Sequence, residues 1–114
     1  MGSNEWIRVE RIMKLKSARD VSAILKLLRE EHPLKHRRLR VRIVPMKDHG
    51  SSQMSGNEKL ITIHLREQDS SETKIFFLLH EYAHALEDDE RGMHSKRWGQ
   101  IHSQLYTTWV STLG

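Results

Sequence analysis

The chain has 114 residues and no cysteine, which is the size of one small domain and excludes disulfides, cysteine nucleophiles and cysteine-ligated metals. Of its residues 37% are hydrophobic and 30% are charged, and no apolar run is long enough for a membrane span or a secretory signal. We therefore expect a soluble, cytoplasmic, monomeric protein that does not enter a membrane. Any metal must be bound by His, Asp or Glu, and eight histidines are present.

Positive charge is concentrated in the N-terminal half. Residues 1–57 contain 13 Lys and Arg against 6 Asp and Glu, whereas residues 58–114 contain 6 against 9. Within residues 35–42 the cationic side chains are Lys35, Arg37, Arg38, Arg40 and Arg42. One interpretation is a surface that binds nucleic-acid phosphates non-specifically through counterion release, which would place the protein at the nucleoid or in the nucleus. The alternative is the solvent-exposed face of a strand whose other face is apolar.

The first predicted element is a helix over residues 18–31. Apolar residues recur there at helical spacing, Ser17 and Asp20 are suited to cap its start, and Pro33 ends it. Residues 1–16 show no clear period, so we expect them to form an arm, either as a strand or as irregular chain. The single domain is then expected to occupy residues 17–114.

Two strands are expected next, over residues 39–44 and 60–65, with a polar, turn-rich loop over residues 46–58 between them. Because side chains alternate along a strand, His64 lies on the face opposite the core if Ile61, Ile63 and Leu65 face it.

Two helices are expected to complete the chain. Asp69 and Glu72 resemble a capping box that opens a helix over residues 70–88, with Gly92 as a stop, and a final helix is expected over residues 95–111. The order helix–strand–strand–helix–helix predicts a small α+β domain whose short sheet packs on the helix over 70–88.

The strongest chemical signal is the His-Glu-x-x-His motif formed by His80, Glu81 and His84. On a helix the two histidines lie about 40° apart and one turn from each other, so both imidazoles can reach one metal ion. Glu81 is rotated by about 100° from His80, which suits a carboxylate that reaches a metal-bound water. The alternative is a helix surface on which two histidines happen to be four residues apart.

A catalytic zinc ion usually has three protein ligands and one open position, so a third donor is needed. No Asp or Glu follows residue 90, which excludes a distant downstream glutamate. The remaining donors are Glu87, Asp88, Asp89, Glu90, His94 and His102. We favour His94, because the chain can turn back after Gly92 and present this imidazole from the start of the next helix.

The segment from Leu79 to Leu86, followed by His94 and Trp98, resembles the core of the SprT-like and WLM-type zinc metallopeptidases. The resemblance covers about half of the chain. It implies a zincin-like domain, one zinc ion at His80, His84 and His94, Glu81 as the catalytic base, and Trp98 as a packing residue behind the third ligand. Because proteases of the SprT-like type are associated with DNA, it also adds to the nucleic-acid interpretation of the basic segment.

The sequence thus predicts a zinc-dependent endopeptidase in which Glu81 takes a proton from the attacking water and passes it to the leaving amine. His102, Tyr106 and His64 are candidates for a second group that stabilises the transition state. The strand over residues 60–65 is a candidate edge for pairing with an extended protein or peptide substrate. The rival hypothesis is a non-catalytic nucleic-acid-binding or assembly module in which zinc has a structural role.

Overall fold

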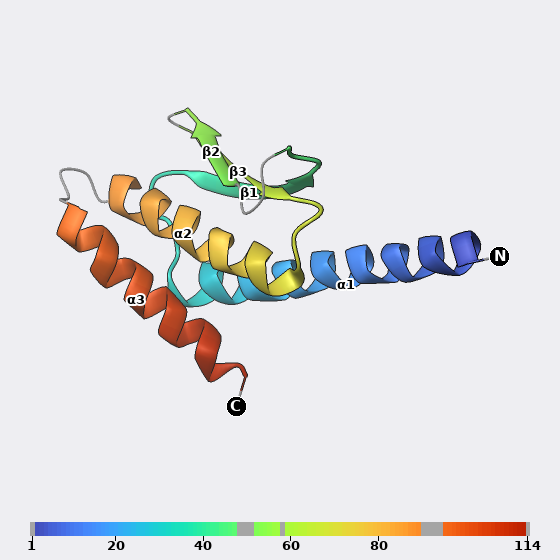
Figure 1. Cartoon of the computed structure of the whole chain (residues 1–114). Helices are drawn as coiled ribbons and strands as arrows, with labels where there is room; N and C mark the ends of the chain where they lie inside the picture. The colour runs from blue at the N-terminus through green and yellow to red at the C-terminus, as the bar shows by residue number, and fades with distance from the viewer. Residues whose placement is uncertain (1, 48–51, 58, 90–94, 114) are drawn as a thin grey trace.

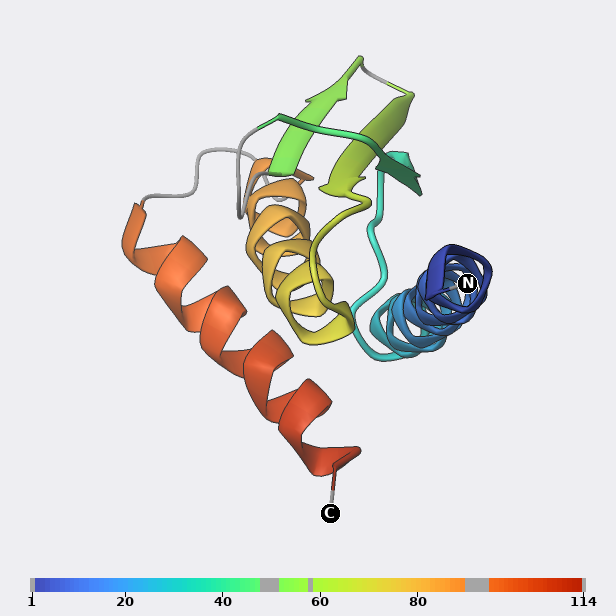
Figure 2. The same ribbon diagram turned by 45° about the vertical axis from the view of Figure 1, so that its right-hand side comes forward.

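A computed structural model describes residues 2–47, 52–57, 59–89 and 95–113, with the backbone alone at residues 2–14, 52–54, 88, 89, 95 and 96. In chain order the elements are α1 (Gly2–Glu31), β1 (Arg38–Val44), β2 (Ser52–Gly56), β3 (Leu60–Arg66), α2 (Ser71–Asp89) and α3 (Ser95–Ser111). The three helices lie on one side of a three-stranded sheet, and α2, which packs on the sheet, lies between α1 and α3 (Figures 1 and 2). The fold is α+β, as the sequence predicts.

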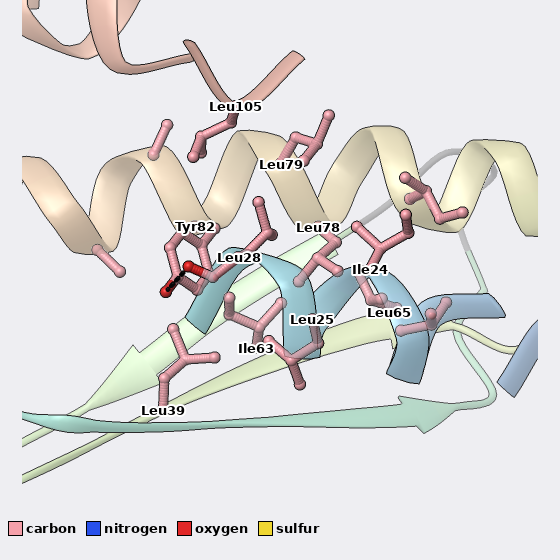
Figure 3. Packing of buried hydrophobic residues seen from close by; sticks show 14 of the residues in the cluster. Ile24, Leu25, Leu28, Leu39, Ile63, Leu65, Leu78, Leu79, Tyr82 and Leu105 are labelled. Carbon is pink, nitrogen blue, oxygen red and sulfur yellow. Dashed lines mark hydrogen bonds between the residues drawn. The ribbon is translucent and has the colours of Figure 1, made fainter. Parts of the chain in front are cut away.

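The core lies between the sheet and the helices, with α2 at its centre (Figure 3). Ile61, Ile63 and Leu65 of β3 are almost fully buried, which confirms the predicted orientation of this strand. They share one buried cluster with apolar residues of the helices, including Leu28, Leu78, Leu79, Tyr82 and Leu105. Removing this much apolar surface from water is the main favourable term in the stability of the fold.

Helix α1 is longer than predicted, and residues 2–16 belong to it rather than to a strand or an irregular arm. Residues 3–31 contain neither Gly nor Pro, so once the helix has formed near residue 20 nothing in the sequence stops it from continuing toward the N-terminus. Ser17 and Asp20 therefore lie inside the helix and do not cap it. Ser17 is buried, and Asp20 accepts a hydrogen bond of 2.8 Å from the hydroxyl of Ser71 at the start of α2.

The predicted loop over residues 46–58 is wrong in part, because it contains the edge strand β2. The sheet order is β1-β3-β2, with β1 parallel and β2 antiparallel to β3. Strand β2 is polar and has weak strand propensity, so its pairing with β3 is what holds it extended. Gly56 is needed at its end, since a Cβ atom there would lie 2.5 Å from the carbonyl oxygen of Leu60.

The start of α2 also differs from the prediction. Its cap is Ser70, whose hydroxyl accepts a hydrogen bond of 3.2 Å from the backbone N–H of Thr73. Asp69 instead accepts a bond of 2.9 Å from the guanidinium of Arg66, which also donates to the backbone oxygen of Met46 at 2.9 Å. The carboxylate of Asp69 thus binds Arg66 in the turn between β3 and α2, and Ser70 caps the helix instead.

Candidate metal centre

His80 and His84 lie on successive turns of α2, on the side that faces α3. Both side chains are half-buried, and their ring centroids are 4.8 Å apart. Two imidazoles that bind one zinc ion have ring centres about 5 Å apart, given Zn–N bonds of about 2.0–2.1 Å and a tetrahedral angle. The spacing of these two residues in the folded protein therefore fits two ligands of a single metal ion.

The rotation of α2 about its axis is fixed by the residues between and around the two histidines. Leu78, Leu79 and Tyr82 are fully buried in the core. The hydroxyl of Tyr82 donates a hydrogen bond of 2.7 Å to the backbone oxygen of His32, just beyond the end of α1. Because these contacts hold the apolar face of α2 against the sheet and α1, the histidines are directed toward α3.

Glu81 follows His80 and is buried, with 9% of its surface exposed. A carboxylate at this position is close to the two imidazoles along the helix but is rotated away from them by about 100°. Burying a carboxylate is costly unless it interacts with other groups, and Glu81 has such an interaction within the fold. Its burial is therefore compatible with a structural role as well as with proton transfer next to a bound metal.

Trp98 of α3 packs directly against this pair of histidines. Its ring stacks on His84 with centroids 5.1 Å apart and on His102 with centroids 4.9 Å apart. Its indole N–H donates a hydrogen bond of 3.3 Å to the backbone oxygen of His80. Trp98 is therefore a packing residue of the candidate centre, although its predicted partner His94 lies outside the described residues.

His102, one turn after Trp98, is the only one of the three predicted stabilising groups that the structure brings near His80 and His84. Its ring centroid is 6.5 Å from that of His80, and its buried Nε2 atom has no hydrogen-bond partner among the residues that the structure describes. Burial lowers the pKa of His102 below its ordinary value of 6.5, and the nearby His80 and His84 lower it further. The ring is therefore held in its neutral form near pH 7.

The described residues bring together two candidate metal ligands and no third. Within residues 2–47, 52–57, 59–89 and 95–113, no three His, Asp or Glu side chains are grouped to hold an ion. Trp98 keeps His102 away from such a position by lying against both His84 and His102. Of the other predicted donors, Glu87 is half-buried on α2, Asp88 and Asp89 are described by their backbone alone, and Glu90 and His94 lie outside the described residues.

The two other candidate stabilising residues lie apart from this centre. His64 is on the sheet face opposite the helices, in register with Arg42 of β1 and Gln53 of β2. Tyr106 follows His102 by one turn on α3, and 46% of its surface is exposed. Sequence reasoning did not single out Phe76, which contacts His102 edge-on with ring centroids 6.2 Å apart. The sequence signal for Phe76 was its position four residues before His80, which puts the two side chains on the same face of the helix.

The basic residues of β1 lie on the sheet face that the helices do not cover. Arg38, Arg40 and Arg42 are exposed, whereas Leu39 is buried and Val41 and Ile43 are half-buried, which confirms the predicted alternation of the strand. The Nε atom of Arg40 donates a bond of 2.9 Å to the hydroxyl of Thr62 on β3. Lys35 and Arg37 precede the strand.

Comparison of the chain with protein-family models, with curated proteins and with solved structures gave no significant match. None of the described helices is both long and apolar enough to cross a membrane.

Proposed function

We propose that this protein is a zinc-dependent metalloendopeptidase with a zincin-like fold, in keeping with the resemblance of its motif to the SprT-like and WLM-type enzymes. The observation that carries the proposal is the pair of half-buried imidazoles 4.8 Å apart on one face of α2, next to the buried Glu81. The short sheet packed on this helix is the arrangement expected of such a domain.

In this proposal His80 and His84 bind the zinc ion together with His94. A zinc ion held there supplies a Lewis acid and lowers the pKa of a bound water to about 7. Glu81 accepts a proton from the water as its oxygen bonds to the peptide carbonyl carbon, and then gives that proton to the leaving amine as the C–N bond breaks. Of the candidate stabilising residues, His102 lies nearest to the two histidines, with its ring centroid 6.5 Å from that of His80.

An extended substrate cannot pair with β3, although the sequence suggested that strand. Both edges of β3 are occupied, by β1 on one side and β2 on the other, so its backbone groups are already paired. The edge strand that packs against α2 is β2. We therefore assign substrate pairing by strand addition to the outer edge of β2.

The decisive experiment replaces Glu81 by Gln, which keeps the size of the side chain and removes its ability to act as a base. We expect the variant to retain one zinc ion per chain and to lose peptide hydrolysis by several orders of magnitude. Glu72→Gln, an exposed position in the first turn of the same helix, is the matched control and should keep full activity. Equal hydrolysis by wild type and Glu81→Gln would refute the proposed role of Glu81.

The same experiment separates the enzyme from the rival hypothesis of a structural zinc in a binding or assembly module. A structural site is closed by four protein ligands and does not need Glu81. Bound zinc without hydrolysis of any protein substrate, together with a fourth protein ligand, would favour the rival.

A second proposal, resting on the exposed arginines of β1, is that the uncovered sheet face binds nucleic acid. The side chains of Arg38, Arg40 and Arg42 project from one face of one strand, at alternate positions. Lys35 and Arg37 extend this cationic surface at the start of the strand. No aromatic side chain lies among these residues to stack on bases, so binding through phosphates would be non-specific. DNA-associated proteins would then be natural substrates.

Replacing the three strand arginines together by Ser tests this proposal with duplex DNA. Each phosphate contact that is lost should lower the slope of log affinity against log salt by about 0.9. A matched control replaces Lys16, Arg19 and Lys26, which are exposed on α1, by Ser and removes the same charge elsewhere. Equal weakening by both triple variants would indicate only a general charge effect, and an unchanged affinity in the strand variant would exclude the sheet face.

A further inference from the structure

The end of the chain has a composition unlike the rest. Residues 98–113 contain no Asp, Glu, Lys or Arg, although 30% of the whole chain is charged. This segment is most of α3, which runs along α2 at the outside of the molecule, away from the sheet (Figures 1 and 2). A surface helix usually carries charged residues on its solvent face. From Trp98 onward, the surface of α3 is therefore suited to a neutral partner, and the cations of this helix are confined to its first turn, at Lys96 and Arg97.

One face of α3 is used by the core, through the buried Ile101 and Leu105. A second row of apolar and aromatic residues follows successive turns at i, i+4 spacing, from His102 to Tyr106 and Val110. Tyr106 is 46% exposed and Val110 is 44% exposed. Packing within the described part of the fold therefore does not account for Tyr106 and Val110.

Phe76 of α2 extends the row across to the neighbouring helix. It is 45% exposed and contacts His102 edge-on. We call the surface formed by Phe76, His102, Tyr106 and Val110 the α3 stripe. Of the five large hydrophobic side chains that are exposed in the described part of the chain, three belong to this stripe, and a fourth, Leu113, follows it on the chain.

The α3 stripe begins at the candidate metal centre. His102 belongs to the stripe and also stacks on Trp98, which in turn stacks on His84. The stripe is therefore joined to the two proposed metal ligands through a continuous row of stacked rings.

We infer that the α3 stripe is the binding surface for one side of the polypeptide substrate and selects large apolar side chains there. The inference rests on the proposed peptidase function, because it places the substrate at His80 and His84. The substrate chain passes the ring of His102, and its apolar side chains lie on Phe76, Tyr106 and Val110. A neutral, apolar surface of this kind favours an unfolded or hydrophobic protein segment.

The test measures peptide binding without hydrolysis, on the zinc-loaded Glu81→Gln protein. The probes are two fluorescein-labelled dodecapeptides of Gly, Ser and Asn, one with Phe and Leu at every third position and one with Ser there. We expect the apolar peptide to bind at least tenfold more tightly by fluorescence anisotropy. In NMR spectra, titration with this peptide should shift the backbone amide signals of the protein mainly within residues 98–113.

Three variants assign the binding to the stripe. Phe76→Ser and Tyr106→Ser should each weaken binding of the apolar peptide about five- to tenfold. The reason is that roughly half of each ring is exposed in the free protein and becomes buried when the peptide binds. Leu15→Ser is the matched control, since Leu15 is 63% exposed on α1, and should leave the affinity unchanged. Circular dichroism checks that each variant is folded.

The outcomes separate this inference from the proposed function. Equal binding of both peptides, or equal affinities of the stripe variants and the parent, overturns the inference even if zinc binding and hydrolysis are found. A wild-type dimer that Tyr106→Ser dissociates in sedimentation also overturns it, because the stripe is then covered by a second copy. Stripe-dependent binding in a protein that shows neither zinc nor hydrolysis supports the surface as a peptide site and refutes the peptidase.

Discussion

Replacing Tyr82 by Phe tests whether the hydroxyl that anchors α2 to the end of α1 stabilises the fold around the candidate centre. The ring is fully buried, and the substitution leaves it in place. The hydroxyl donates at 2.7 Å to the backbone oxygen of His32 and lies 3.3 Å from that of Leu28. Leu28 keeps a partner in the variant, because its oxygen also accepts a bond of 2.7 Å from the N–H of His32.

Tyr82→Phe therefore removes one hydrogen bond and leaves the carbonyl oxygen of His32 without the donor it has in the parent protein. Such a loss destabilises a protein by about 1–2 kcal/mol. For a chain of this length we expect Tm to fall by about 4–8 °C. Urea unfolding followed by tryptophan fluorescence measures the change, and the m value should stay constant.

The chain has only two tyrosines, and the second provides the control. Tyr106 is 46% exposed, so Tyr106→Phe should change the free energy of unfolding by less than about 0.5 kcal/mol. A change below about 0.5 kcal/mol for Tyr82→Phe, or equal changes for both variants, would refute the anchoring role of the Tyr82 hydroxyl.

Three further predictions concern stability. Ser70→Ala removes the cap of α2 and should cost about 1 kcal/mol in urea unfolding, whereas Ser70→Asp should restore most of it. Leu28→Ala should cost about 3–5 kcal/mol, since the side chain is fully buried, and a cost near 1 kcal/mol would mean that the core is looser than described. In chelator-treated protein, the lowered pKa of His102 means that the unfolded chain binds more protons below pH 6.5. Stability should therefore fall as the pH drops through and below 6.5, and His102→Gln should reduce this fall; an unchanged pH profile in that variant would contradict the assignment.

The elements that sequence patterns predicted well are those with strong periodicity and clear breaks. The sequence placed the ends of four elements within about one residue: the helices over 70–88 and 95–111 and the two predicted strands. In each of them the apolar residues follow either the helical or the strand period and do not fit the other one. The N-terminal half of α1 was missed because its apolar residues have no clean period, although it lacks any helix breaker. Strand β2 was missed because Ser52–Gly56 is polar, although Gly56 and Asn57 before a strong strand are a hairpin signal.

The candidate site was predictable only where its residues lie on one element. The spacing of His80 and His84 along a helix determines that their rings adjoin, and the structure confirms this proximity. The stacking of Trp98 between His84 and His102 depends on how α3 packs on α2, which no local pattern specifies. For the same reason the sequence could not show that β3 is the central strand.

A crystal structure of the zinc-loaded protein, with anomalous scattering at the zinc edge, tests directly whether α2 binds a metal ion that has an open position beside Glu81. We expect one zinc ion bound to His80, His84 and His94, with no fourth protein ligand and with the carboxylate of Glu81 facing the open position. A zinc ion bound elsewhere, or one enclosed by four protein ligands, would refute the proposed centre.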